Sequence, residues 1–172
     1  PAVTILPGFI NAHVHNAYDL SSLQVWAAAG VTTVRDLGAR WAGSMDYWFL
    51  LRDRLATFPK AARLIAAGPL VTVPGGYPIS GNRFESLAVT SPEDAREQIA
   101  ALLDAGAEVV KITLTVEEPP TLPLAEAAAI VETAHARGIP VTAHLELSVS
   151  LERALDAGVD DIAHSVGDPP SD

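Results

Sequence analysis

The feature that most constrains the fold of this chain is a segment that occurs four times. Each copy has a glycine, then a short apolar run, then a residue that can bind a metal or move a proton. The four copies are Gly30–Asp36, Gly106–Lys111, Gly138–His144 and Gly158–His164. A glycine after a helical stretch commonly ends the helix, and a Val/Ile-rich run after it predicts a buried parallel strand. The repeat therefore predicts alternating helices and strands, with a chemical group near the C-terminal end of each strand.

The same pattern extends along the whole chain. We expect strands at residues 9–14, 31–37, 63–67, 108–114, 140–145 and 160–165, and helices at residues 19–29, 45–57, 92–105, 124–137 and 148–157. Residues 68–89, rich in Pro and Gly, are expected to form a long functional loop. Strict alternation predicts an α/β fold with a parallel sheet. A complete eight-stranded barrel takes about 250 residues. We therefore expect residues 1–172 to form one incomplete TIM (β/α)8-type barrel domain with about six parallel strands and five helices.

Composition excludes several kinds of partner. The formal net charge is −10 and no basic patch could meet phosphates, so neither nucleic acid nor an anionic membrane is expected to bind. There is no signal peptide and no apolar run of about 18 residues, so a cytoplasmic location is the default expectation. The chain has no cysteine, which excludes thiolate metal ligands. It starts at Pro1 and its only methionine is Met45, so we expect a fragment of a longer reading frame.

The sharpest local motif is the pair His13 and His15 at the end of the first expected strand. Side chains at positions i and i+2 of a strand point to the same face, here toward the mouth of a barrel. Neutral imidazole is a good ligand for zinc and similar divalent ions. The motif therefore predicts a metal site, with two partly exposed turn histidines as the alternative.

Lys111 is the most unusual residue, because it lies within a run that is typical of a central strand. A buried lysine is rare, and burial lowers its pKa and favours a neutral amine. Such an amine could form a Schiff base, or take up carbon dioxide to give a carbamate whose two oxygens bridge two cations. The alternative is a lysine that extends from the strand end to solvent.

Other candidate residues lie at strand ends or in the long loop. His144 and His164 close neighbouring strands at matched positions, which favours metal binding over two separate core histidines. His135 lies in the middle of a helical stretch and is predicted to be a surface residue. Asp36 ends the second strand, where it could orient a metal ligand or only cap the next turn. Tyr77 follows two glycines in the long loop, so it is a candidate substrate contact, with a plain turn as the alternative.

Together these residues resemble the amidohydrolase superfamily of metal-dependent hydrolases. The resemblance rests on PGFINAHVH at 7–15, AGVTTVRD at 29–36 and GAEVVK at 106–111. It also rests on the order His-x-His, Lys, His, His across strands one, four, five and six, which matches the binuclear branch. The resemblance covers nearly the whole chain and is closest to the prolidase-like and imidazolonepropionase-like amidohydrolases.

The resemblance implies a pair of divalent metals, usually zinc. His13 and His15 would bind one metal and His144 and His164 the other, while Lys111 as a carbamate would bridge them together with a hydroxide. The chain departs from the family in three respects. Asn11 stands where many members have aspartate, and Tyr77 where prolidase-like members often have histidine. The family's catalytic aspartate on strand eight and its small β-sandwich domain lie outside this sequence.

The leading functional hypothesis is an amidohydrolase that cleaves a C–N bond in a small amide, dipeptide or lactam. We expect residues 1–172 alone to be inactive, since the general base is absent, and the full-length parent is compatible with a homo-oligomer. One alternative is a Schiff-base lyase or aldolase that uses Lys111. Another is a non-catalytic partial barrel that only binds metal, or that a separate chain completes through its open strand edges.

Overall fold

The computed structural model describes residues 3–39, 44–78, 86–116 and 119–168. It contains α-helices and parallel β-strands in the following order: β1 (Phe9–Val14), α1 (Leu20–Ala28), β2 (Val31–Asp36), α2 (Met45–Leu55), β3 (Arg63–Ala66), β4 (Leu70–Thr72), β5 (Ser86–Ala88), α3 (Pro92–Ala105), β6 (Val110–Thr113), α4 (Leu124–His135), β7 (Val141–His144), α5 (Ser148–Ala157) and β8 (Asp161–Ile162). Each of the six predicted strands and five predicted helices is present. None of the described helices is long and apolar enough to cross a membrane.

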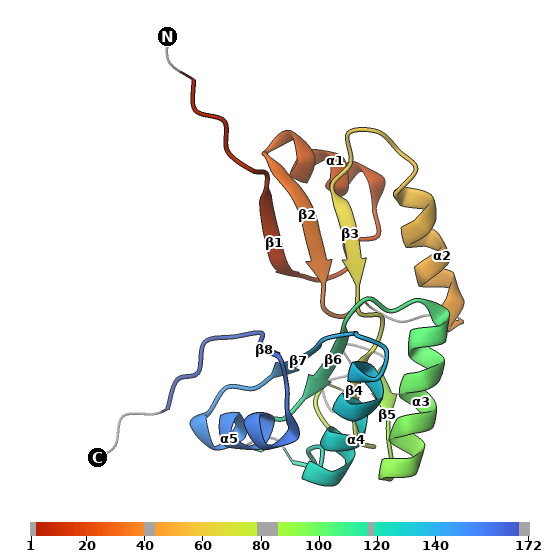
Figure 1. Ribbon diagram of the computed structural model, residues 1–172, viewed down its shortest axis with the longest axis vertical. Helices are drawn as coiled ribbons and strands as arrows, with labels where there is room; N and C mark the ends of the chain where they lie inside the picture. Colours follow the sequence, from red (N-terminus) through yellow and green to blue (C-terminus); the bar gives the residue numbers. More distant parts are fainter. Residues whose placement is uncertain (1–2, 40–43, 79–85, 117–118, 169–172) are drawn as a thin grey trace.

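The strands form two sheets with the orders β1-β2-β3 and β5-β4-β6-β7-β8. Every strand pair is parallel, as expected for strands joined by helical crossovers. The C-terminal ends of β2 and β3 point toward the larger sheet, and α3, α4 and α5 lie against that sheet (Figure 1). The arrangement confirms the predicted α/β class and the partial barrel.

The expectation of a long loop at 68–89 was wrong in part. Its described portions contain the short strands β4 and β5, which pair with each other, while residues 79–85 lie outside the described residues. The sequence signal of β4 is only three residues long and stands between Pro69 and Pro74, which is why a loop was expected. Burial decides the outcome, because Leu70 and Val71 are almost inaccessible to solvent and Val71 pairs with Ile112 of β6.

Helix boundaries follow the local chemistry that the sequence predicts. Ser91 caps α3 by accepting a hydrogen bond from the backbone N–H of Asp94, with Pro92 in the first turn. Gly106 and Gly158 end α3 and α5 with φ angles of 117° and 82°, which side chains with a Cβ rarely adopt. Two of the four repeated glycines are thus left-handed helix caps that turn the chain directly into the next strand.

The apolar core of the described residues has one large part and two smaller parts, the smallest formed by Leu37, Ala67 and Val109. The larger cluster lies between the five-stranded sheet and its helices, and includes Ile99, Leu102, Ile112 and Ile130, all fully buried. A smaller cluster lies between the three-stranded sheet and α1 and α2, and is built on residues such as Leu23. These clusters fix the strands from outside, so the strands' C-terminal ends are left to form a polar cavity.

Candidate metal centre

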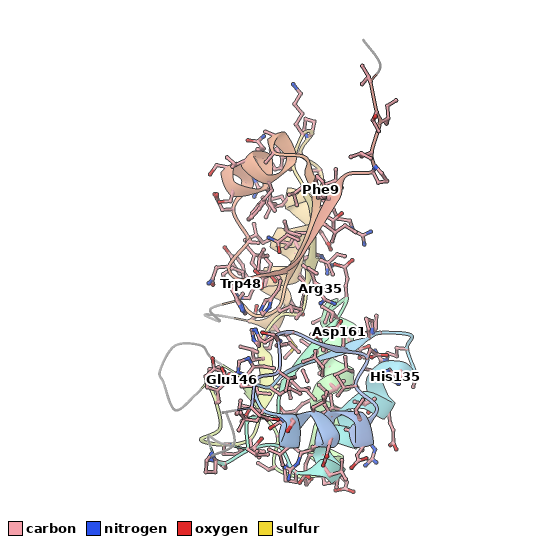
Figure 2. All side chains as sticks on the ribbon, turned by 90° about the vertical axis from the view of Figure 1, so that its left-hand side faces the viewer. Phe9, Arg35, Trp48, His135, Glu146 and Asp161 are labelled. Carbon is pink, nitrogen blue, oxygen red and sulfur yellow. The ribbon has the colours of Figure 1, made fainter. Side chains whose placement is uncertain are left out.

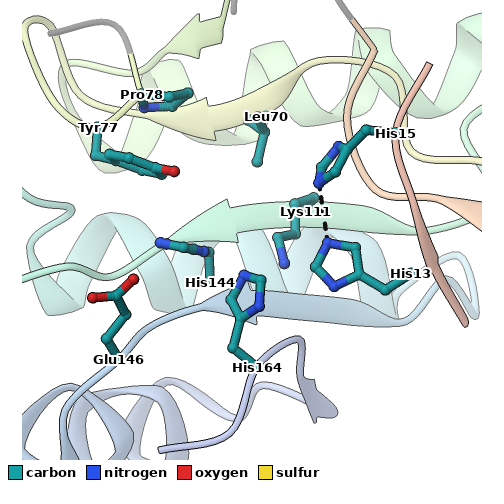
Figure 3. A pocket seen from close by; sticks show the side chains of 9 residues that line it. All are labelled: His13, His15, Leu70, Tyr77, Pro78, Lys111, His144, Glu146 and His164. Atoms are coloured by element: carbon teal, nitrogen blue, oxygen red, sulfur yellow. Dashed lines mark hydrogen bonds between the residues drawn. The ribbon is translucent and has the colours of Figure 1, made fainter. Parts of the chain in front are cut away.

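A cavity of about 280 Å³ lies where the C-terminal ends of the two sheets meet. Its lining residues are His13, His15, Leu70, Tyr77, Pro78, Lys111, His144, Glu146 and His164 (Figure 3). The structure thus places all five residues predicted as metal ligands around one space. It adds Leu70, Pro78 and Glu146, which sequence reasoning missed.

His13 and His15 are both anchored through the ring nitrogen that faces away from the cavity. Nδ1 of His13 lies 3.1 Å from the carbonyl oxygen of Ala163, and Nδ1 of His15 lies 2.8 Å from that of Gly38. A carbonyl oxygen can only accept, so each Nδ1 must carry the proton and donate it. Each neutral ring therefore presents the lone pair of its Nε2 atom to the cavity.

The two Nε2 atoms lie 3.0 Å apart. Two lone pairs at this distance repel each other unless a proton or another cation lies between them. Imidazoles on one tetrahedral zinc, with bonds of 2.0–2.1 Å, would have nitrogens about 3.3 Å apart. The spacing of His13 and His15 thus suits a shared cation after a small opening of the pair.

Lys111 is the second residue of β6 and is 1% exposed, so it lies deeper in the strand than the C-terminal end that the sequence predicts. Its four-carbon side chain is long enough to reach from this position in the strand to the cavity, where it places Nζ (Figure 3). Among the described residues, no group forms a hydrogen bond with this Nζ. Burial lowers the pKa of Lys111 to about 7, an effect that Asp161 opposes and Arg35 reinforces. A substantial fraction of the amine is therefore neutral at physiological pH.

The other two histidines complete the ring of nitrogen donors. His144 is the last residue of β7 and is buried, while His164 lies two residues beyond β8. Their ring centroids are 4.5 Å apart, and those of His13 and His164 are 4.8 Å apart. Burial, followed by the neighbouring His164, lowers the pKa of His144 to about 3. Burial and the nearby Lys111 lower that of His13 to about 4. These imidazoles are thus held in the neutral form that binds metals.

Within the described residues, no three His, Asp or Glu side chains are already grouped closely enough to hold an ion. Lys111 is not among these His, Asp and Glu side chains. A carbamate on Lys111 would add two oxygen donors beside the histidines. The role of the five residues as metal ligands therefore stays a prediction.

An ion pair joins the two sheets beside Lys111. The guanidinium of Arg35 on β2 lies 2.7 Å from the carboxylate of Asp161 on β8, and its Nε also donates to the carbonyl oxygen of Ala12 at 2.8 Å. Figure 2 shows Arg35 and Asp161 facing each other between the sheets. Sequence reasoning missed this pair, although Arg35 gives the same signal as Lys111, a cation within a strand.

Asp36 is fully buried but does not line the cavity. Its carboxylate accepts hydrogen bonds from the backbone N–H groups of Ala17 at 2.7 Å and Gly38 at 3.0 Å. The carbonyl oxygen of the same Gly38 accepts the Nδ1–H of His15. Burial raises the pKa of Asp36, whereas these hydrogen bonds lower it. The contacts favour the role of orienting a metal ligand, with Gly38 as the link.

We expect the Asp36→Asn variant to lower the free energy of unfolding by about 1–3 kcal/mol. An asparagine can accept from only one of the two backbone donors, since its NH₂ group would face the other N–H. The ring of His15 should then lose its fixed orientation. Urea unfolding and the ¹⁵N signals of His15 measure both effects, with Asp46→Asn on the exposed part of α2 as the control. Unchanged stability and unchanged His15 signals would refute the positioning role.

Tyr77 lies against His144 in a tight loop. The two rings are stacked with centroids 4.7 Å apart and an angle of 11° between their planes, and Thr113 donates to the Tyr77 carbonyl oxygen at 3.0 Å. A Cβ at Gly76 would come within 2.5 Å of Thr72 Oγ1 and 2.8 Å of the Pro120 carbonyl oxygen, so only glycine allows this packing. The structure places Tyr77 where it could meet a ligand, and that contact stays a prediction.

His135 lies apart from the other histidines. It is on the outer side of α4, where its Nε2 is 2.9 Å from the carboxylate of the exposed Asp160 (Figure 2). This position agrees with the predicted surface residue and makes His135 a suitable control for tests on the cavity.

The comparisons with known proteins agree with this geometry. The sequence model of the amidohydrolase family matches residues 4–170. A crystal structure of a candidate prolidase from Bifidobacterium longum is 32% identical, with a TM-score of 0.73 over 91% of this chain and 39% of its own. A Xaa-Pro dipeptidase with bound methionine in the active site is 25% identical, with a TM-score of 0.72 over 91% and 47% of the two chains. A prolidase complexed with N-methylphosphonate-L-proline is also 25% identical, with a TM-score of 0.70 and the same coverage.

This chain therefore spans less than half the length of these similar structures. A search of curated proteins finds no significant match.

Proposed function

This chain belongs to the amidohydrolase family, and on that premise we propose that its cavity is the metal centre of a hydrolase for C–N bonds. The observation that carries the proposal is the pair His13 and His15, each fixed through Nδ1, with their Nε2 atoms 3.0 Å apart. Beside them lies the buried amine of Lys111, which forms no hydrogen bond with the described residues. Four imidazoles around one buried amine form a donor set that suits divalent ions. Structures matched at 25–32% identity include prolidases, which supports hydrolysis as the reaction class.

His13 and His15 would hold one ion, and His144 and His164 the other, with zinc as the expected metal. A pair of divalent ions here would activate water and polarise a scissile carbonyl. The chain's own contribution is to fix the ligands in advance. The carbonyl oxygens of Ala163 and Gly38 select the tautomer of His13 and His15, so the two rings need little reorganisation when metal arrives.

Lys111 would bridge the two ions as a carbamate. The neutral amine attacks carbon dioxide, an N–C bond forms, and the nitrogen loses a proton, which leaves an anion with two oxygens. Burial favours this step because it lowers the pKa of the amine to about 7. The bridge also relieves an unfavourable feature of the fold, since a buried amine without a hydrogen-bond partner destabilises the chain.

The general base is expected from outside residues 1–172, where the resemblance places an aspartate on strand eight. The two buried or half-buried aspartates near the cavity are already engaged. Asp36 binds backbone N–H groups, and Asp161 binds Arg35 and Thr142. The complete reaction is therefore proposed for a protein that includes the eighth strand, and we expect residues 1–172 to bind metal without efficient turnover.

The proposed substrates are small amides, dipeptides and lactams. The cavity of about 280 Å³ suits a molecule of that size better than an extended peptide. Tyr77 is the proposed substrate contact, because its ring lines the cavity on the side away from His13 and His15 (Figure 3). Dipeptides that end in proline are the first compounds to test, since prolidases are among the similar structures.

Metal content and hydrolysis can be tested together. We expect zinc-loaded protein to hold about two ions per chain, and His13→Asn to lose at least one, while His135→Asn keeps both. Plasma mass spectrometry measures the metal, and ninhydrin detection follows hydrolysis of N-acyl amino acids, dipeptides and lactams by a chain extended through strand eight. Equal metal content in the His13 and His135 variants would rule out the proposed centre.

The Schiff-base alternative rests on the same buried amine of Lys111 but gives no role to the four histidines. Borohydride reduction in the presence of a small aldehyde separates the two hypotheses. A Schiff-base enzyme would gain covalent mass at Lys111 without added metal, whereas the metal centre predicts protection of this amine once zinc and bicarbonate are present.

A further inference from the structure

The cavity has two chemically different ends (Figure 3). The proposed metal ligands His13, His15 and Lys111 lie at one end, whereas Tyr77, Pro78 and Glu146 lie at the other. The carboxylate of Glu146 points toward the stacked rings of Tyr77 and His144. A substrate whose amide lies at the histidines would therefore extend toward Tyr77 and Glu146.

Glu146 is held in place by its backbone and left open at its side chain. The preceding Leu145 is fully buried, and the carbonyl oxygen of Glu146 accepts a hydrogen bond from the N–H of Gly167 at 3.0 Å. No lysine or arginine within the described ranges forms an ion pair with its exposed carboxylate. The end of β7 thus places an exposed carboxylate at the mouth of the cavity, where it forms no ion pair with a described lysine or arginine. Burial lowers the pKa of the neighbouring His164, and the charge of Glu146 opposes that effect.

The charge of Glu146 is distinctive within the cavity. Among the described lining residues it is the only acidic side chain, and its end of the cavity also holds the stacked rings of Tyr77 and His144 and the apolar Pro78. The carboxylate of Asp161 is paired with Arg35 and does not line the cavity. A carboxylate beside an aromatic ring is a suitable environment for an ammonium or guanidinium group.

We propose that Glu146 and Tyr77 form a specificity subsite for a substrate with a basic side chain. The inference rests on the proposed function, because it describes the far end of a substrate whose amide reacts at the histidines. The carboxylate would bind the cationic head, and the ring of Tyr77 would cover the aliphatic stem. The subsite accounts for an exposed acid that forms no ion pair with the lysines and arginines of the described chain.

The test uses three compounds with one amide bond each and different side-chain charge: N-acetyl-lysine, N-acetyl-norleucine and N-acetyl-glutamate. We expect kcat/KM of the zinc-loaded protein, extended through strand eight, to be about 10-fold higher for the lysine compound than for the norleucine compound. The Glu146→Gln variant should reduce this ratio to about 1. Glu146→Lys should instead favour the glutamate compound. Glu97→Gln, an exposed site on α3 outside the cavity, should leave the ratio unchanged.

Binding provides a readout that is independent of turnover. NMR titration of the same protein with N-acetyl-lysine should shift the amide signals of residues 145–148, and Glu146→Gln should abolish these shifts. An unchanged lysine-to-norleucine ratio in Glu146→Gln would overturn the subsite. An equal loss of kcat for all three compounds would also overturn it, since it would identify Glu146 as a proton carrier. If neither the wild type nor any variant hydrolyses a compound, the proposed function fails. The NMR titration with N-acetyl-lysine then tests by itself whether Glu146 binds a cationic side chain.

Discussion

Replacing Lys111 with methionine is expected to abolish the paired metal site and, at the same time, to stabilise the metal-free chain. Loss of the bridging group should remove at least one of the two ions and lower hydrolysis by the extended protein more than 1,000-fold, an effect of about 4 kcal/mol. The stabilisation has a separate cause. The amine of Lys111 is buried and forms no hydrogen bond with the described residues, and an unsatisfied buried polar group costs about 1–3 kcal/mol of the free energy of unfolding, a cost that methionine would remove.

The pH dependence of this stabilisation provides a check on its cause. The pKa of Lys111 is about 7 in the folded chain, against an ordinary lysine pKa of 10.5, so the unfolded state binds more protons between these pH values. The penalty is therefore fully present below about pH 7 and disappears as the pH rises toward 10.5. Urea unfolding of chelator-treated Lys111→Met should show an advantage over wild type that shrinks from pH 7 to pH 9.5.

The other lysine of the chain serves as the control. Lys60 is exposed, so Lys60→Met should change neither the metal content nor the pH dependence of stability. A Lys111→Met variant that keeps two ions, or that is less stable than wild type at pH 7 without metal, would contradict this account of Lys111.

The second large effect is acid lability of the metal-free chain between about pH 6.5 and pH 4. Burial lowers the pKa of His13 to about 4 and that of His144 to about 3, from the ordinary histidine pKa of 6.5. In this window the unfolded state binds more protons than the folded state, so stability is present above pH 6.5 and is lost as the pH falls. Both rings retain some exposure to solvent, so the full pKa shifts overstate the effect. We therefore expect the free energy of unfolding to fall by roughly 2–4 kcal/mol over this pH range. That is a large part of the 5–15 kcal/mol typical of a domain.

Circular dichroism during urea unfolding at pH 7.5, 6 and 4.5 measures this loss. His144→Gln should flatten the profile, whereas His135→Gln, at the surface, should leave its slope unchanged. The carboxylate of Asp19, with a pKa of about 2, stays ionised over this range. A profile that is flat from pH 7.5 to 4.5 in the metal-free wild type would show that the histidines are not held neutral by the fold.

Much of the fold could be predicted because local signals and global packing agree. Gly106 and Gly158 stop their helices through backbone conformations that only glycine adopts readily. The run after Gly106 is a buried strand as expected, whereas the short strand after Gly158 is half-buried. The same logic places His13, His144 and His164 at strand ends, and parallel strands bring such ends together. The cavity residues that belong to this repeat were therefore accessible from sequence.

The remaining features depend on contacts between distant segments, which leave little local signal. β4 is too short to show periodicity, and it forms because Val71 pairs with Ile112 of β6. Glu146 is one of many glutamates in an acidic chain, and only the turn from β7 into α5 brings it to the cavity. Arg35 is identified as an interior residue only by its ion pair with Asp161, which is 126 residues away in sequence.

The central claim is that His13, His15, Lys111, His144 and His164 hold a pair of metal ions, and anomalous diffraction at the zinc edge tests it most directly. Crystals grown with zinc and bicarbonate should show two peaks about 3.5–4 Å apart within the cavity, with density for a carbamate between them at Lys111. Peaks confined to surface sites such as His135 and Asp160, with an empty cavity and an unmodified Lys111, would contradict the claim.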